Sequence, residues 1–166
     1  QSMNEKLIRQ YLNEQWLFEW KYSQLIPTPG NSASQFSGAE FQSIGMKLGT
    51  FNAWMAALSE ILCGLLLCLG FLTSFAASGV IGIMIVAGWT VHKNKGFFII
   101  KEGWEYVFIL SIVSLTIAVI GPGNWSLDHV LEISDDFIGW NGFWIAGGLG
   151  ISAGLIQLSL FFRPEK

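Results

Sequence analysis

Residues 54–72 read WMAALSEILCGLLLCLGFL, an apolar run in which Glu60 is the only charged side chain. Two further apolar runs follow at 75–91 and 104–120, and a fourth covers 137–162. An α-helix rises 1.5 Å per residue, so runs of this length cross about 30 Å of hydrocarbon. The four runs therefore predict four membrane-spanning helices.

The composition agrees with a membrane protein. Hydrophobic residues make up 52% of the chain and charged residues only 13%, whereas soluble domains carry about 25% charged residues. We therefore expect an all-α integral membrane protein, a four-transmembrane-helix bundle whose main partner is the lipid bilayer. The net charge is −3 and there is no basic run or stripe, so we expect no nucleic-acid partner.

The N-terminal region has a different pattern. Across residues 4–26, apolar side chains such as Leu7, Tyr11, Trp16 and Trp20 recur at helical spacing, with charged residues between them. The segment is too polar to span. It predicts an amphipathic helix that lies on the membrane surface or against the bundle. The alternative is a soluble packing helix.

The chain divides into three parts. Residues 1–50 hold the amphipathic helix and a polar linker, residues 51–128 a three-helix membrane core, and residues 129–166 an acidic external loop and the last span. Gly150 and Gly154 in that span have the GxxxG spacing that lets another helix approach closely. A homo-oligomer through this glycine-rich span is therefore one expectation.

Several stretches resemble the DoxX family of membrane proteins. Residues 60–73 follow the pattern E-x-x-x-G-x-L-L-x-L-G-x-x-T, and residues 121–128 read GPGNWSLD, an ending typical of the family. Between them, VHKNKGFF at 91–98 and EGWEY at 102–106 continue the resemblance. The chain departs from the family in having a polar helix where a first span is usual, and Ser74 where Arg is frequent.

The resemblance implies a redox role. DoxX-like proteins are named for a relation to the membrane subunit of a thiosulfate:quinone oxidoreductase, and other members are linked with thiol-oxidative stress complexes. We therefore expect a bacterial inner-membrane protein, a quinone- or thiol-linked redox component that works with a partner subunit. If it is an enzyme, it is a quinone-linked oxidoreductase subunit, with quinone as the candidate cofactor. The alternative is a non-catalytic membrane scaffold or assembly subunit that docks partner proteins.

Glu60 is the first candidate for chemistry. A carboxylate inside a spanning helix is costly unless it is neutral, paired or facing a cavity. We expect Glu60 to be protonated at neutral pH and to face a cavity shared with the second and third spans. Such a group could exchange a proton. The alternative is a hydrogen bond to a neighbouring helix that serves packing alone.

His92 and Glu105 lie near the same ends of the second and third spans, where they could form a proton-active pair. The candidate catalytic residues are therefore Glu60, His92 and Glu105, and the candidate quinone site is Glu60, Gly64, His92 and Trp104. Alternatively, Glu105 stabilises the start of its own helix and His92 is solvated.

Other polar residues suggest structure rather than chemistry. Asp128 and His129 would need further ligands to hold a metal, so no metal site is expected, and Ser126 or Asp128 could cap a short helix. Cys63 and Cys68 lie on different helix faces, which disfavours a disulfide between them. We interpret both cysteines as small apolar packing residues.

The basic residues predict the orientation. Four spans place the N-terminal region, the connector at 91–101 and the C-terminus on one side, and all nine Lys and Arg residues fall there. The other side holds the acidic segment 128–136. The positive-inside rule therefore predicts a multi-pass protein of the cell membrane with both termini in the cytoplasm.

This orientation predicts the result of a labelling experiment. A cysteine placed at Ser134 should react with a membrane-impermeant thiol reagent in intact cells, because segment 124–136 would be external. The measurement is the labelled fraction before and after lysis. Labelling that occurs only after lysis would contradict the orientation.

Overall fold

The computed structural model describes residues 33–164. The chain divides into two compact units, Gln1–Phe36 and Ser37–Lys166, and the second contains the membrane bundle discussed below. The amphipathic helix expected at residues 4–26 lies outside the described residues.

The described residues form helices joined by short connectors. In chain order the elements are α2 (Ala33–Ser43), α3 (Gly49–Leu69), α4 (Thr73–Ala87), the π-helical η1 (Gly88–His92), the short η2 (Ile99–Lys101), α5 (Glu105–Ile120), α6 (Leu127–Val130), η3 (Ser134–Asp136), α7 (Gly139–Trp144), the π-helical η4 (Ile145–Leu149) and α8 (Gly150–Phe161). The pair α4–η1 forms one continuous helix, and α7, η4 and α8 form another.

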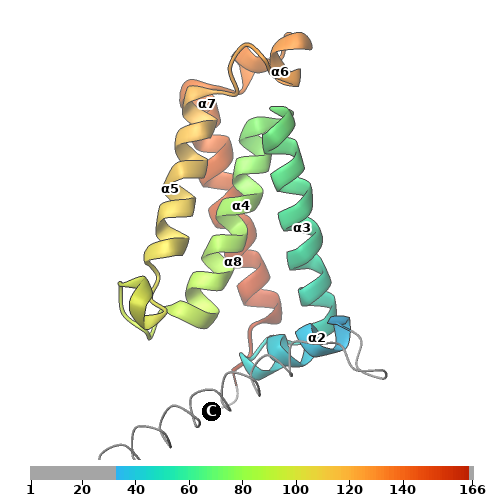
Figure 1. Ribbon diagram of the computed structural model, residues 1–166, viewed down its shortest axis with the longest axis vertical. Helices are drawn as coiled ribbons and strands as arrows, with labels where there is room; N and C mark the ends of the chain where they lie inside the picture. Colours follow the sequence, from blue (N-terminus) through green and yellow to red (C-terminus); the bar gives the residue numbers. More distant parts are fainter. Residues whose placement is uncertain (1–32, 165–166) are drawn as a thin grey trace, which may run out of the picture. The chain divides into compact units, whose positions relative to one another are not determined.

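Three of these continuous helices are long and apolar enough to cross a membrane: Gly49–Leu69, Thr73–His92 and Gly139–Phe161. The fourth apolar helix, α5, is shorter, at 16 residues. Figure 1 shows the four helices side by side in one bundle. The predicted all-α membrane bundle is confirmed, and the protein is a multi-pass membrane protein.

The first span differs from its prediction at both ends. It begins at Gly49 rather than Trp54, and it ends at Leu69 because Gly70 adopts φ +59°. The Gly70 N–H donates to the carbonyl of Leu67, and the Phe71 N–H to that of Leu66. This pair of bonds is a Schellman motif, which satisfies carbonyls that the helix end would leave without donors.

The two ends of the bundle differ in charge. One end carries the start of α3, the connector from η1 to α5 and the end of α8, while α6 lies at the other (Figure 1). The described basic residues belong to segments at the first end: Lys47, Lys93, Lys95, Lys101 and Arg163. The acidic residues of 128–136 belong to the opposite end.

Helix α4 is central to the packing, since it contacts α3, α5 and α8. A Cβ added to Gly150 would lie 2.7 Å from the Ser78 carbonyl oxygen, and one added to Gly154 would lie 3.1 Å from that of Gly82. Small residues allow this close approach of helix backbones. The glycine face that we expected to support an oligomer is therefore covered by α4 within the chain.

The end of α8 is tied to the start of α3. The Lys47 N–H donates to the Phe161 carbonyl (2.8 Å), and the Arg163 N–H donates to the Gly45 carbonyl (2.7 Å). The buried Asn52 of α3 donates to the Lys47 carbonyl (2.6 Å) and accepts from Gln157 Nε2 of α8 (3.2 Å). These bonds fix the position of Gln157 beside the cavity described below.

The close crossing of α4 and α8 predicts the effect of a larger side chain. Gly154→Leu should lower the free energy of unfolding by about 1–3 kcal/mol, since overpacking forces backbones apart. Gly148→Leu is the matched control on the same continuous helix, because an added Cβ there meets nothing within 4 Å. Unfolding in detergent, followed by circular dichroism, measures both. Equal losses would show that the crossing is not tight.

Candidate functional site

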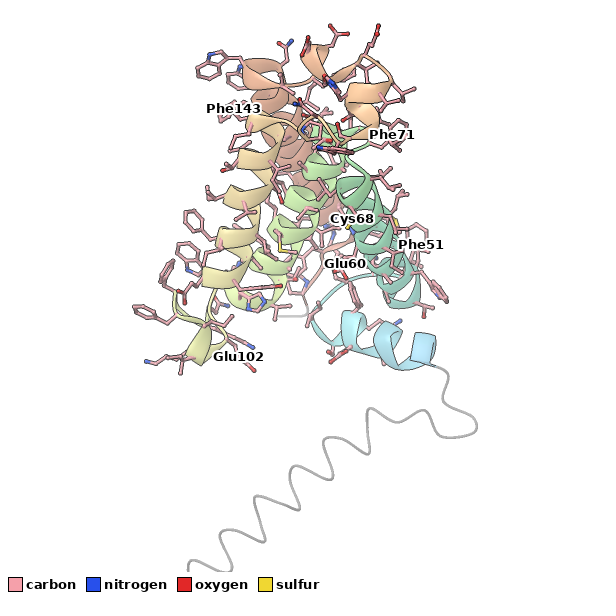
Figure 2. The ribbon with its side chains drawn as sticks, turned by 45° about the horizontal axis from the view of Figure 1, so that its top comes forward. Phe51, Glu60, Cys68, Phe71, Glu102 and Phe143 are labelled. Carbon is pink, nitrogen blue, oxygen red and sulfur yellow. The ribbon has the colours of Figure 1, made fainter. Side chains whose placement is uncertain are left out.

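Glu60 lines a cavity of about 300 Å³ between α2, α3, the α4–η1 helix and α8. Figure 2 shows Glu60 on α3, in the half of the bundle nearer α2. The lining is mostly apolar, and its residues are Glu40, Phe41, Ile44, Met55, Ala56, Ser59, Glu60, Ile83, Val86, Ala87, Thr90, Val91 and Gln157. The site is thus an apolar cavity with a few polar groups.

The sequence of α3 explains how Glu60 reaches this cavity. Met55, Ala56, Ser59 and Glu60 recur at the spacing that places residues on one helix face, and all four line the cavity. Ala56 of α3 and Ala87 of α4, both small, line the cavity and leave room between the helices. Space between α3 and α4 therefore follows from side-chain size.

The structure differs from the expected surroundings of Glu60. The second span contributes to the cavity, as expected, but the third span, α5, contributes none of its lining. Helix α5 packs instead against α4 and α7. Glu60 is also exposed rather than enclosed by protein, so the cavity is open beside its carboxyl group.

A second carboxylate, Glu40 of α2, lines the same cavity. The sequence pattern predicted a polar linker here, with one short helical patch around residues 41–48, and Glu40 was not among the predicted site residues. The available signal was the adjacent Phe41 together with Ile44, whose spacing is helical. The lining residues include two carboxylates and neither Lys nor Arg. A bound molecule would therefore meet hydrogen-bonding carboxyl groups rather than a cation.

His92 and Glu105 have separate partners in the described structure. His92 Nδ1 lies 2.6 Å from the Glu102 carbonyl oxygen, and since a carbonyl only accepts, Nδ1 donates. Glu105 Oε2 accepts from the Ile99 N–H at 3.0 Å. Both side chains thus hold the connector between η1 and α5. Their role in proton transfer stays a prediction.

Gly64 and Trp104 do not line the Glu60 cavity. A Cβ added to Gly64 would meet nothing within 4 Å, which places this glycine beside open space. Trp104 packs edge-to-face on Phe97 and Phe108, with ring centroids 4.7 and 5.7 Å apart. The expected quinone residues Glu60, Gly64, His92 and Trp104 are therefore not brought together in one cavity.

Asp128 has a structural role that the sequence analysis missed. Its buried carboxylate accepts from the Leu72 N–H (2.7 Å), the Thr73 N–H (3.0 Å) and the Thr73 hydroxyl (2.8 Å). Its own N–H donates to the Gly70 carbonyl (2.9 Å). Asp128 therefore caps the start of α4 from a segment far along the chain.

The neighbouring Ser126 caps the short helix α6. The sequence had left open whether Ser126 or Asp128 would cap such a helix. Its hydroxyl oxygen accepts from the His129 N–H at 3.2 Å.

Among the residues that the structure describes, no group of three His, Cys, Asp or Glu could hold a metal ion. Cys63 and Cys68 are both free, the first buried and the second exposed.

The comparisons with known proteins agree with the sequence motifs. Residues 28–93 match the DoxX family model. The "Uncharacterized membrane protein Rv3486" of Mycobacterium tuberculosis is 29% identical over 110 residues, covering 59% of this chain and 66% of that protein. An "Uncharacterized protein" of Haemophilus influenzae is 29% identical over 80 residues, covering 48% and 53%. No solved structure matches.

The apolar bundle defines a multi-pass membrane protein. Residues 28–93 are similar to the DoxX family of membrane proteins, as the motif at 60–73 implied. The later motifs at 102–106 and 121–128 lie outside the matched residues. The chain spans just under two thirds of one relative and about half of the other.

The Asp128 cap predicts a large effect on stability. Asp128→Ala would leave two N–H groups and one hydroxyl at the start of α4 without their acceptor, and should cost about 2–4 kcal/mol of unfolding free energy. Asp135→Ala, an exposed change in the same acidic segment, is the control. Thermal unfolding in detergent compares them. Similar melting temperatures would contradict the role of this cap.

Proposed function

We propose that the protein binds a quinone in the Glu60 cavity and acts as the membrane component of a redox complex. The observation that carries this proposal is a carboxyl group at the open side of an apolar cavity within a membrane bundle. Ligand cavities of about 300–1,000 Å³ with a few polar groups are typical of small-molecule sites. The family resemblance supports a quinone as the ligand.

The lining suggests how a quinone would be held. Its ring would pack on apolar residues such as Phe41 and Met55, and its tail would leave through the opening beside Glu60 into lipid. A protonated Glu60 would donate a hydrogen bond to one quinone carbonyl. Gln157, whose amide nitrogen is directed to Asn52, would use its oxygen to accept from a quinol hydroxyl.

Quinone reduction needs both protons and electrons. Reduction to the quinol takes two electrons and two protons. The Glu60 carboxyl would give one proton to the nearer quinone oxygen as that O–H bond forms and would be reprotonated from water at the nearby end of the bundle, while the second proton would reach the other oxygen from water. We assign the electrons to a partner redox subunit. The proposal therefore makes this chain the quinone-binding and proton-handling member of a complex.

The proposed orientation follows the charges at the two bundle ends. We infer that the end bearing Lys47, Lys93 and Arg163 faces the cytoplasm, because positively charged loops are retained there. Segment 124–136, which is acidic, would then be external. The protein would lie in the cell membrane, with the Glu60 cavity in the cytoplasmic half of the bundle.

Glu60→Gln tests the proposed role of the carboxyl group. The variant keeps the size of the side chain but lacks an exchangeable acid proton, so it should fold normally and bind a water-soluble quinone analogue about tenfold more weakly. Quenching of tryptophan fluorescence during titration measures the affinity. Glu132→Gln, in the acidic segment at the other end, should bind like the unchanged protein.

The same experiment separates a redox role from packing or scaffolding. If Glu60→Gln binds quinone normally while Glu60→Leu lowers the melting temperature, then Glu60 serves packing alone. If the unchanged protein neither retains quinone on purification nor binds the analogue, the scaffold alternative is favoured.

A further inference from the structure

A second hollow lies on the other side of α4, between the α4–η1 helix and α5, with a volume of about 370 Å³. Toward the middle of the helices its wall includes the aliphatic side chains of Met84 and Ile85. Toward the connector it includes the rings of Trp89 and Trp104. We call it the α4–α5 groove. The wall of this groove therefore changes from aliphatic side chains at one end to aromatic rings at the other.

A single positive charge stands at the aromatic end of this groove. Lys93 lines it, and its Nζ lies 4.2 Å from the centroid of the Trp89 ring. A cation over an aromatic face is held by the ring quadrupole, which fixes the ammonium group at this position. An ammonium group has three donors, so an anion beside the ring could still be bound.

The wall that carries Trp104 is held rigidly by the connector. The Trp104 N–H donates to the Gly96 carbonyl (3.1 Å) and the Glu105 N–H to that of Phe97 (2.8 Å). The Glu105 carboxylate holds the Ile99 N–H. The groove is therefore formed before any ligand binds, which lowers the entropy lost on binding.

The surroundings of the groove suit the boundary between lipid tails and headgroups. Trp89 and Trp104 are both exposed, and tryptophan is enriched at this level of the bilayer. Phe98 and Ile100 in the connector are 64% and 93% exposed, next to Lys101. Exposed apolar and basic side chains together favour a surface with anionic headgroups.

We propose that the α4–α5 groove binds one anionic phospholipid. Lys93 binds the phosphate, the Trp89 and Trp104 rings flank the glycerol region, and an acyl chain lies along the aliphatic wall. Free phosphate would leave that wall unfilled. A zwitterionic lipid would bind more weakly, because its own cationic group would lie near Lys93 and oppose the attraction between Lys93 and the phosphate.

This site differs from the Glu60 cavity in charge and position. The Glu60 cavity has carboxylates and no basic lining residue, whereas the α4–α5 groove has Lys93 and no acidic lining residue. The two are lined by different residues of the α4–η1 helix, Val86 and Thr90 for one, Ile85 and Trp89 for the other. Lipid binding can thus be tested without reference to quinone.

Native mass spectrometry of the detergent-purified full chain tests the proposal. Phosphatidylglycerol should bind with one tight site, and Lys93→Gln should weaken that site about tenfold. The matched control is Lys47→Gln, which removes the same charge from an exposed residue of the same bundle end outside the groove. Lys93→Arg keeps the positive charge and should retain most of the affinity.

Three outcomes would overturn the lipid site. Equal losses in Lys93→Gln and Lys47→Gln would mean attraction to the general surface charge. Equal affinity for phosphatidylcholine would mean that the phosphate charge is not recognised. Displacement of phosphatidylglycerol by inorganic phosphate at comparable concentration would mean an anion site without a role for the acyl chain. Unfolding curves of lipid-free Lys93→Gln and unchanged protein should coincide.

Discussion

The hydrogen bonds between the Asp128 carboxylate and the start of α4 are the constraint on which the bundle depends. A helix that begins inside a membrane protein has N–H groups that need acceptors, because lipid offers none. Asp128 supplies acceptors to Leu72 and Thr73, and its negative charge suits the positive end of the helix dipole. Since α4 contacts α3, α5 and α8, the level at which α4 begins sets the register of its neighbours.

The central position of α4 also divides the molecule into two chemical environments. On one face, with α3, it lines an open cavity with carboxyl groups, and on the other, with α5, it forms a groove with one lysine. Small residues make both possible, since Ala87 and Gly88 leave space where larger side chains would fill it. One apolar helix can therefore separate the proposed quinone site from the proposed lipid site, because the two lie on different faces of that helix.

The sequence predicted the helices well because hydropathy depends on local composition. Their ends were predicted less well, because the cap of α4 comes from Asp128, which lies far along the chain. The GxxxG spacing showed that a helix approaches Gly150, but it carries no information about which helix, and α4 is the partner. Glu60 and Trp104, which we grouped in one site, line different hollows, because hydropathy predicts the depth of a residue in the membrane and not the direction of each helix face. Glu40 was missed because a polar linker and a short surface helix have similar composition.

The short length of α5 has a consequence for the membrane itself. Sixteen residues at 1.5 Å each span about 24 Å, roughly 6 Å less than a typical hydrocarbon core. This hydrophobic mismatch is relieved when lipids next to the helix compress, at a cost of fractions of a kcal/mol per Å. The bilayer beside α5 would then be locally thin, and the protein would concentrate in thinner regions of the membrane. The geometry of one helix can in this way influence where in the bilayer the whole molecule resides.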